Sequence, residues 1–186
     1  LRQAIENGKK VTLRYLSRHL ADGRNIETTE KNFKVSPYAL IWTDDHYYLV
    51  CNNEKYNNLM HLRLDRMKSV AETEESARHF KECSDYVNKF DTADYVSKAF
   101  NMFGGSLTEI ELRCKETILE QVIDRFSDKI HIIERENGKF CFRIKALLSE
   151  GLIGWLMQFG ADIEVVSPIE LRAKIKDKIQ EMANLY

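Results

Sequence analysis

The feature that most constrains the fold is a change of hydrophobic period along the chain. From Val11 onward apolar and polar residues alternate, with Val11, Leu13 and Tyr15 on one face. This is the period of a half-buried β-strand. Similar short stretches follow as far as residue 71, separated by turn signals such as Asp22-Gly23. About five or six short strands after one small helix predict a closed, SH3-like β-barrel.

The second half of the chain follows another order. A charged, helix-favouring stretch ends at Gly104-Gly105, and after it come a strand, a helix, a hairpin about Asn137-Gly138, a second helix and a last strand. This βαββαβ order is that of the ferredoxin-like split βαβ fold. We therefore expect an α+β chain with a barrel at 1–72, a helical connector at 73–105 and a ferredoxin-like domain at 106–186 that closes with a C-terminal helix.

The helix boundaries of the second half carry specific signals. Ser149 is placed to cap a helix that runs through Phe159. Ser167-Pro168-Ile169-Glu170 reads as a capping box with proline at the first helical position. In the last helix one narrow stripe is expected to be core, namely Leu171, Ile175, Ile179, Met182 and Tyr186. The segment 152–159 is more apolar than one buried face needs, so part of it is a candidate dimer contact.

Composition limits the classes of function. With 44% hydrophobic and 31% charged residues among 186, the chain has the make-up of a soluble globular protein. Its formal net charge of −1 means that any attraction to nucleic acid must come from local patches. Four widely spaced cysteines form no CxxC pair, which favours a reduced, cytoplasmic protein without a metal site. No apolar run reaches membrane length, and a first residue other than Met suggests a fragment that lacks an N-terminal domain.

Three phrases in the predicted barrel have a recognisable content, order and spacing. They are Ser36-Pro37-Tyr38-Ala39-Leu40, His46-Tyr47-Tyr48-Leu49-Val50 and His61-Leu62-Arg63-Leu64-Asp65-Arg66-Met67. Together they resemble the WYL domain of bacterial transcription regulators, with Tyr47 in place of the family's tryptophan and Met60-His61 where many members carry a further basic residue. The second half resembles the C-terminal extension that usually follows a WYL domain, down to Pro168-Ile169-Glu170-Leu171-Arg172.

The resemblance implies a fold, partners and a role. It implies an Sm-like barrel within a regulator whose N-terminal part, absent from this chain, is a winged helix-turn-helix that binds double-stranded DNA. It also implies a homodimer that responds to a nucleotide or to single-stranded nucleic acid, and neither a cofactor nor a membrane. Tyr47 and Leu49 are expected to pack in the core, and the predicted ligand-binding residues are Tyr15, Ser36, Tyr48, His61, Arg63, Asp65, Arg66 and Arg172. For Tyr15 and Tyr48, packing in the core is an equal alternative to stacking on a base.

The two arginines are placed by strand parity. Leu62 and Leu64 share one face of their strand and should fill the barrel, so Arg63 faces outward. Arg66 has the parity of the leucines and would be buried unless Asp65-Arg66 breaks the strand, which we expect because an unpaired buried arginine costs several kcal/mol. The planar arginine fork suits a phosphate. The alternative is a surface strand with solvated arginines.

Three classes of function stay open. We favour an effector-binding regulatory module, in which the basic stretch from Lys9 to Arg24 extends the groove. The second is a dimerisation or protein-interaction domain with no small ligand. The third is an unrecognised nuclease or nucleotide hydrolase. The third fares worst, because His61 and Asp65 lie about 13 Å apart on an extended strand. The cysteine and histidine spacings also match no zinc pattern.

Overall fold

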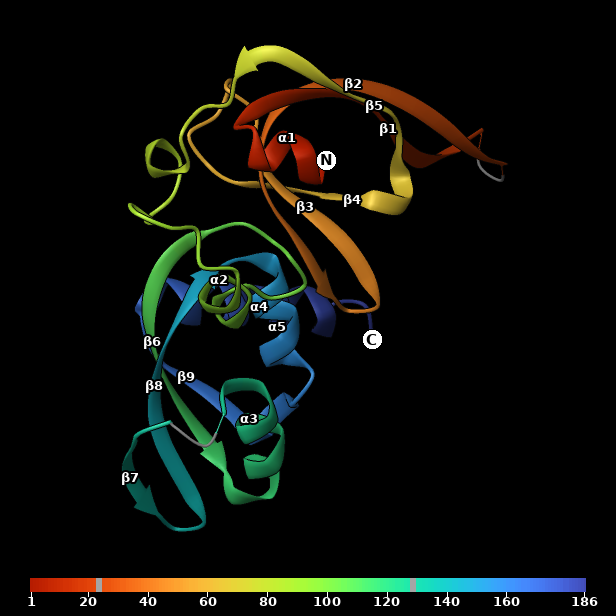
Figure 1. The fold of residues 1–186 in the computed structure, drawn as a ribbon. Coiled ribbons are helices and arrows are strands. Elements are labelled where there is room, and N and C mark those ends of the chain that lie inside the picture. Colours follow the sequence, from red (N-terminus) through yellow and green to blue (C-terminus); the bar gives the residue numbers. More distant parts are fainter. Residues whose placement is uncertain (23–24, 128–129) are drawn as a thin grey trace. The chain divides into compact units, whose positions relative to one another are not determined.

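The computed structural model describes residues 1–22, 25–127 and 130–186 of the chain. It divides into two compact units, Leu1–Thr92 and Ala93–Tyr186. Figure 1 shows the elements of each unit, which are described separately below. None of the described helices is both long and apolar enough to cross a membrane.

The N-terminal unit is a five-stranded antiparallel sheet curved around one short helix (Figure 1). The core consists of Val11, Leu13, Val35, Leu49, Cys51 and Leu62, together with Ala4 of the helix. The strands that the alternation predicts are therefore confirmed, because their apolar faces enter this core. The elements are α1 (Arg2–Glu6), β1 (Lys9–Ala21), β2 (Asn25–Thr43), β3 (His46–Asn52), β4 (Met60–Arg63) and β5 (Met67–Ser76).

The second strand is longer than the sequence suggests. We expect two strands divided at Pro37, but β2 is continuous and pairs with β1 as far as Val35 and with β3 from Ser36. The register shifts between Pro37 and Ala39. Proline has no N–H to donate to a neighbouring strand, and a bulge is one of the few places where a strand tolerates it. The turn that the sequence predicts at Asp22-Gly23 extends outside the described residues at Gly23.

The expected closed barrel is not what the structure shows. The strand order is β4-β3-β2-β1-β5, so β4 and β5 form opposite edges. No ladder joins these two strands within the described part of the chain, although only the 3-10 turn η1 (Leu64–Arg66) separates them in sequence. The turn directs β5 away from β4 and onto β1, where Met67 pairs with Tyr15. The sheet is therefore open.

The segment after β5 is only partly helical. It contains the 3-10 turn η2 (Phe80–Glu82) and the helix α2 (Thr92–Lys98). Aromatic contacts hold its first part against β2: the ring centroid of Tyr38 lies 6.1 Å from that of Phe80 and 6.3 Å from that of Phe90. The boundary between the units lies at Thr92, inside the stretch predicted as a connector.

The C-terminal unit has the βαββαβ order that the sequence predicts. Its antiparallel sheet has the order β7-β8-β6-β9, and the hairpin between β7 and β8 turns at Asn137-Gly138. Ile110, Leu112, Phe140 and Phe142 lie in its core. The elements are β6 (Ser106–Lys115), η3 (Glu116–Ile118), α3 (Leu119–Phe126), β7 (Ile132–Glu136), β8 (Lys139–Leu148), α4 (Glu150–Met157), η4 (Gly160–Asp162), β9 (Ile163–Ser167) and α5 (Ile169–Ala183).

Two apolar patterns of this unit behave differently from expectation. The stripe on α5 enters the core only at Leu171 and in part at Ile175, while Ile179 is 55% and Met182 50% exposed. The stripe is longer than the core it faces. By contrast the apolar surplus around α4 packs inside the unit, since Trp155 lies 5.4 Å from Phe100 and contacts further rings. These ring contacts bury part of the surplus, and the dimer contact of this segment stays a prediction.

The two predicted helix caps differ in outcome. The Ser149 hydroxyl accepts a hydrogen bond of 3.2 Å from the Leu152 amide, which confirms the cap of α4. Ser167 instead ends β9, and the cap position of α5 falls on Pro168, which has an extended backbone and no side-chain oxygen. The capping box at Ser167 is therefore wrong by one residue.

Replacing the two serines tests this correction. Ser149→Ala should lower the free energy of unfolding by about 1 kcal/mol, because it leaves the Leu152 N–H of a buried helix end without a partner. Ser167→Ala is the matched control and should change it by less than about 0.5 kcal/mol. Chemical denaturation of both variants measures the difference. Equal losses would show that Ser167 does act as a cap.

Candidate functional site

The strand β4 positions the predicted arginines as parity requires. Leu62 is buried in the core and Leu64 packs against it, while the Arg63 side chain, on the other face, is 25% exposed. The strand then breaks into η1 at Leu64–Arg66, and Arg66 is exposed. The predicted break at Asp65-Arg66 is therefore confirmed, and it keeps both arginines out of the core.

Arg63 and Asp65 form a two-point ion pair. Arg63 Nε donates to Asp65 Oδ1 at 3.0 Å and Nη2 donates to Oδ2 at 2.8 Å. The hydrogen bond from Arg63 lowers the pKa of Asp65, and the same contact raises the pKa of Arg63. The carboxylate therefore stays ionised at neutral pH and occupies the guanidinium edge that would bind a phosphate.

Two tyrosines border this ion pair. The Tyr15 hydroxyl accepts a hydrogen bond of 3.2 Å from the Arg63 amide, and its ring packs edge-on against Phe33 at 6.1 Å. Tyr48 lies directly opposite Arg63 in the β3–β4 ladder and is half-buried. Paired residues of neighbouring strands point to the same face, so Tyr48 and Arg63 share one surface. We define the group of Tyr15, Tyr48, Arg63, Asp65 and Arg66 as the η1 site.

The remaining predicted residues, Ser36, His61 and Arg172, are each held in other surroundings within their own unit. Ser36 is fully buried and its hydroxyl accepts a hydrogen bond of 2.9 Å from the Arg78 amide. It holds the segment after β5 and does not present a group to a ligand. Arg172 belongs to the C-terminal unit, where it donates to Glu164 at 2.8 Å and to the Val165 carbonyl at 2.7 Å. His61 is on β4, two residues before Arg63, and burial lowers its pKa to about 4.

The basic stretch from Lys9 to Arg24 is more neutralised than its sequence suggests. Lys10 lies 2.6 Å from Glu54 and 3.1 Å from Glu75, and Arg14 lies 3.1 Å from Glu30. Two of these carboxylates come from distant parts of the sequence, so the local pattern gave no sign of them. Arg24 lies outside the described residues.

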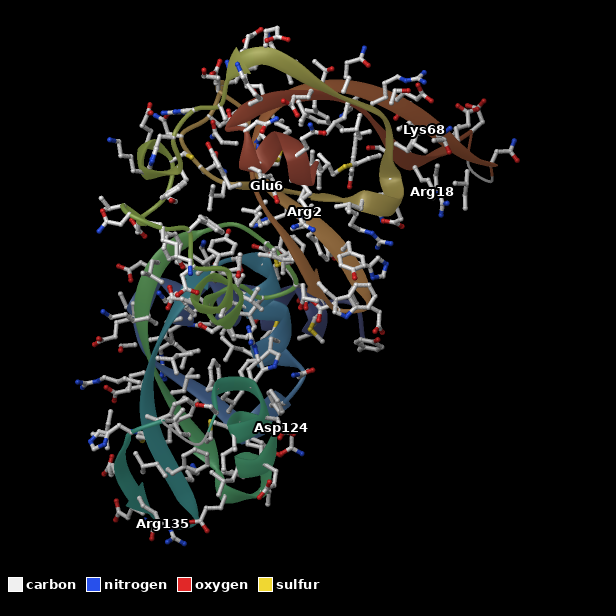
Figure 2. All side chains as sticks on the ribbon, viewed as in Figure 1. Arg2, Glu6, Arg18, Lys68, Asp124 and Arg135 are labelled. Carbon is white, nitrogen blue, oxygen red and sulfur yellow. The ribbon has the colours of Figure 1, made fainter. Side chains whose placement is uncertain are left out.

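Several cations of the N-terminal unit keep their charge accessible. Within the described ranges, the side chains of Arg18, Lys31, Lys55, Arg66 and Lys68 are exposed and have no hydrogen bond or ion pair. Figure 2 shows Arg18 and Lys68 toward the end of the sheet at which β5 begins, and Lys68 pairs with Arg14 in the β1–β5 ladder. Sequence reasoning missed Lys68, because only the β1–β5 pairing brings it to this end of the sheet.

Among the described residues no metal-binding cluster borders the η1 site, while His46 lies beside it, with its ring centroid 6.4 Å from that of Tyr48. The described residues include no group of three or more His, Cys, Asp or Glu side chains placed to hold a metal ion. The four cysteines are free and buried. What the η1 site can do chemically is bind an anion through two arginines beside an aromatic ring.

Each of the two units contains a match to a different protein family. Residues 1–72 match the WYL domain family, and residues 106–183 match the WCX domain family. The chain is a WYL domain followed by a WCX domain. Within the WYL phrase Leu49 is fully buried as expected, but Tyr47 is 55% exposed and packs on Trp42 at 4.6 Å, because this end of the β2–β3 hairpin extends beyond the core.

Relatives of this WYL–WCX chain are longer proteins. It is 27% identical over 158 residues to the uncharacterized HTH-type transcriptional regulator YobV of Bacillus subtilis (strain 168). That alignment covers 82% of this chain and 46% of YobV, so the chain spans less than half of that relative.

Two solved structures are similar to the WYL–WCX chain. Proteasome accessory factor B/C (PafBC) of Arthrobacter aurescens is 19% identical with a TM-score of 0.37, over 100% of this chain and 26% of that one. A CRISPR Cas-related protein is 13% identical with a TM-score of 0.53, over 100% of this chain and 49% of that one. The latter likeness shows a shared fold.

The lowered pKa of His61 predicts a pH dependence of stability. The unfolded chain takes up a proton near pH 6.5, but the folded WYL domain does so only near pH 4. Stability linked to His61 is therefore complete above about pH 6.5 and is lost as the pH falls toward 4, by about 3 kcal/mol in all. His61→Gln should flatten this part of the profile in denaturant unfolding at pH 7, 6, 5 and 4.

Exposed His131→Gln in the WCX domain is the control and should leave the profile unchanged. Carboxylates that titrate in the same range affect wild type and both variants alike. Identical profiles for wild type and His61→Gln would show that His61 is protonated in the fold at its ordinary pKa.

Proposed function

We propose that this WYL–WCX chain is an effector-sensing module of a bacterial transcription regulator and that it binds a nucleotide or a single-stranded nucleic acid at the η1 site. The observation that carries the proposal is the pair Arg63 and Arg66: strand parity turns Arg63 outward beside Tyr48, and the break after β4 leaves Arg66 exposed. Two guanidinium groups and a ring match the phosphate and the base of one nucleotide.

The whole regulator would contain more than this chain. The similarity to YobV, an HTH-type regulator more than twice as long as the matched part, supports a DNA-binding domain N-terminal to the WYL domain. In this arrangement the helix-turn-helix binds double-stranded DNA, and the WYL–WCX chain is the part that senses the effector. The regulator would have no catalytic activity.

The second candidate is an interaction module without a small ligand. The observation that favours it is the end of α5, where Ile179 and Met182 are half exposed. Apolar groups at such exposure are often covered in a homodimer. Under this reading the η1 arginines are solvated and the protein binds no oligonucleotide.

Removing the η1 arginines tests the proposal. Arg63→Ala and Arg66→Ala should each weaken binding of a short 5′-phosphorylated single-stranded oligonucleotide by about 10- to 100-fold, the effect of one lost charge-assisted contact. Fluorescence anisotropy gives the Kd, and melting temperatures should stay within a few degrees of wild type. Arg2→Ala removes the same charge from α1 and should have little effect (Figure 2).

Salt dependence separates the two ligands. A strand held by Arg63, Arg66 and one further cation such as Arg18 or Lys68 should give a log–log slope of about −2, from about −0.7 for each phosphate contact. A mononucleotide stacked on Tyr48 should give a flatter slope, and Tyr48→Ala should then weaken it more than Arg63→Ala does.

If no strand or mononucleotide gives saturable binding, the sensing role is contradicted and the interaction module takes its place. Turnover of either in the presence of a divalent metal would instead show an enzyme.

A further inference from the structure

The two arginines of the η1 site differ in whether their guanidinium group is paired. Arg63 gives both nitrogens of one guanidinium edge to Asp65, at 3.0 and 2.8 Å. Arg66 is exposed and makes no hydrogen bond or ion pair with the part of the chain that the structure describes. One arginine is therefore ready to bind an anion, while the other already holds one, supplied by the protein itself.

The contact is local and can open. Arg63 and Asp65 are two residues apart, on either side of the start of η1, so no long-range packing has to change when they separate. The Asp65 side chain is 57% exposed, which leaves room for its carboxylate to turn toward water. Exposed ion pairs of this kind add little to folding stability, so a ligand can replace the carboxylate at small cost.

We propose that Asp65 is an internal competitor for the anion site, and that a ligand gains Arg63 only when its own charge is high enough to displace this carboxylate. The inference rests on the proposed function of the η1 site. A ligand would first contact Arg66 and then exchange with Asp65 on Arg63.

Competition with the Asp65 carboxylate determines which chemical class of ligand can bind Arg63. An internal phosphodiester carries one negative charge and offers two oxygens, as a carboxylate does, so exchanging Asp65 for it gains little. A terminal phosphate monoester carries about −1.5 to −2 at pH 7 and three strong acceptor oxygens. It therefore displaces Asp65 where a phosphodiester does not. The expected ligand group is a terminal phosphate, either on the end of a strand or on a mononucleotide.

The test uses two oligonucleotides of one sequence that differ only in a 5′-phosphate or a 5′-hydroxyl. Wild-type protein should bind the phosphorylated strand about tenfold more tightly, the effect of one added charge at two arginines. Arg63→Ala should weaken the phosphorylated strand about tenfold and the hydroxyl strand much less, so that the preference is lost. A nucleoside 5′-monophosphate added as competitor shows whether the strand itself is needed, because it displaces the phosphorylated strand only if the terminal phosphate and one base suffice.

The isosteric variant Asp65→Asn addresses the competitor directly. It should tighten binding of the hydroxyl strand about fivefold, the upper range for an exposed ion pair, because a phosphodiester can then use Arg63. Asp85→Asn removes the same formal charge from an exposed position after η2 and is the matched control. The expected result is a higher affinity for the hydroxyl strand with Asp65→Asn alone, at an unchanged melting temperature.

Two results would overturn the competitor while leaving the proposed function intact. One is an equal effect of Asp65→Asn and Asp85→Asn on the hydroxyl strand. The other is an equal weakening of both strands by Arg63→Ala. If neither strand binds saturably to wild type or to Asp65→Asn, the proposed function itself fails, and this outcome is distinct from the other two.

Discussion

A strand that alternates leucine and arginine can bury only one of its two faces, and the WYL domain depends on how this strand ends. Leu62 and Leu64 enter the core, so Arg63 must face outward. A strand continued by three more residues would carry Arg66 into the core at a cost of several kcal/mol. The 3-10 turn at Leu64–Arg66 avoids this cost. It also redirects the chain so that β5 pairs with β1 and leaves β4 at an edge of the sheet.

The same turn explains why the arginines differ from the other cations of the domain. Two of the four Lys and Arg residues of β1 are held by carboxylates, Lys10 by Glu54 and Glu75 and Arg14 by Glu30. Arg63 is held only by a neighbour two residues away, and Arg66 has no such partner within the described residues. A net charge near zero for the whole chain is thus compatible with a local site of positive potential. Binding at that site depends on which charges stay accessible, and the number of basic residues in a stretch does not determine this.

Local patterns predicted the parts of the fold that local chemistry determines. The βαββαβ order, the Asn137-Gly138 hairpin and the Ser149 cap each depend on a few neighbouring residues. Sheet closure does not, because it depends on which edges meet, and the predicted barrel is therefore wrong where the sheet is open. In the same way Ile179 continues a core stripe in sequence but lies beyond the core in space.

The candidate site was predicted in part for the same reason. Parity and the cost of a buried arginine placed Arg63 and Arg66 on the surface, and Tyr48 lies opposite Arg63 as a strand neighbour. Ser36 was chosen from a phrase in the sequence, which contains no sign of the Arg78 amide that its hydroxyl binds. The contact between Arg63 and Asp65 depends on the turn between them, and alternation alone would have placed them farther apart.

In the proposed site Arg63 and Arg66 bind an anion, and Asp65 occupies that place until a ligand arrives. A crystal structure of the protein with a 5′-phosphorylated oligonucleotide tests this arrangement most directly. The terminal phosphate is expected between the two guanidinium groups, with the Asp65 carboxylate turned away from Arg63. A phosphate bound elsewhere on the WYL domain, with the Arg63–Asp65 pair intact, would contradict it.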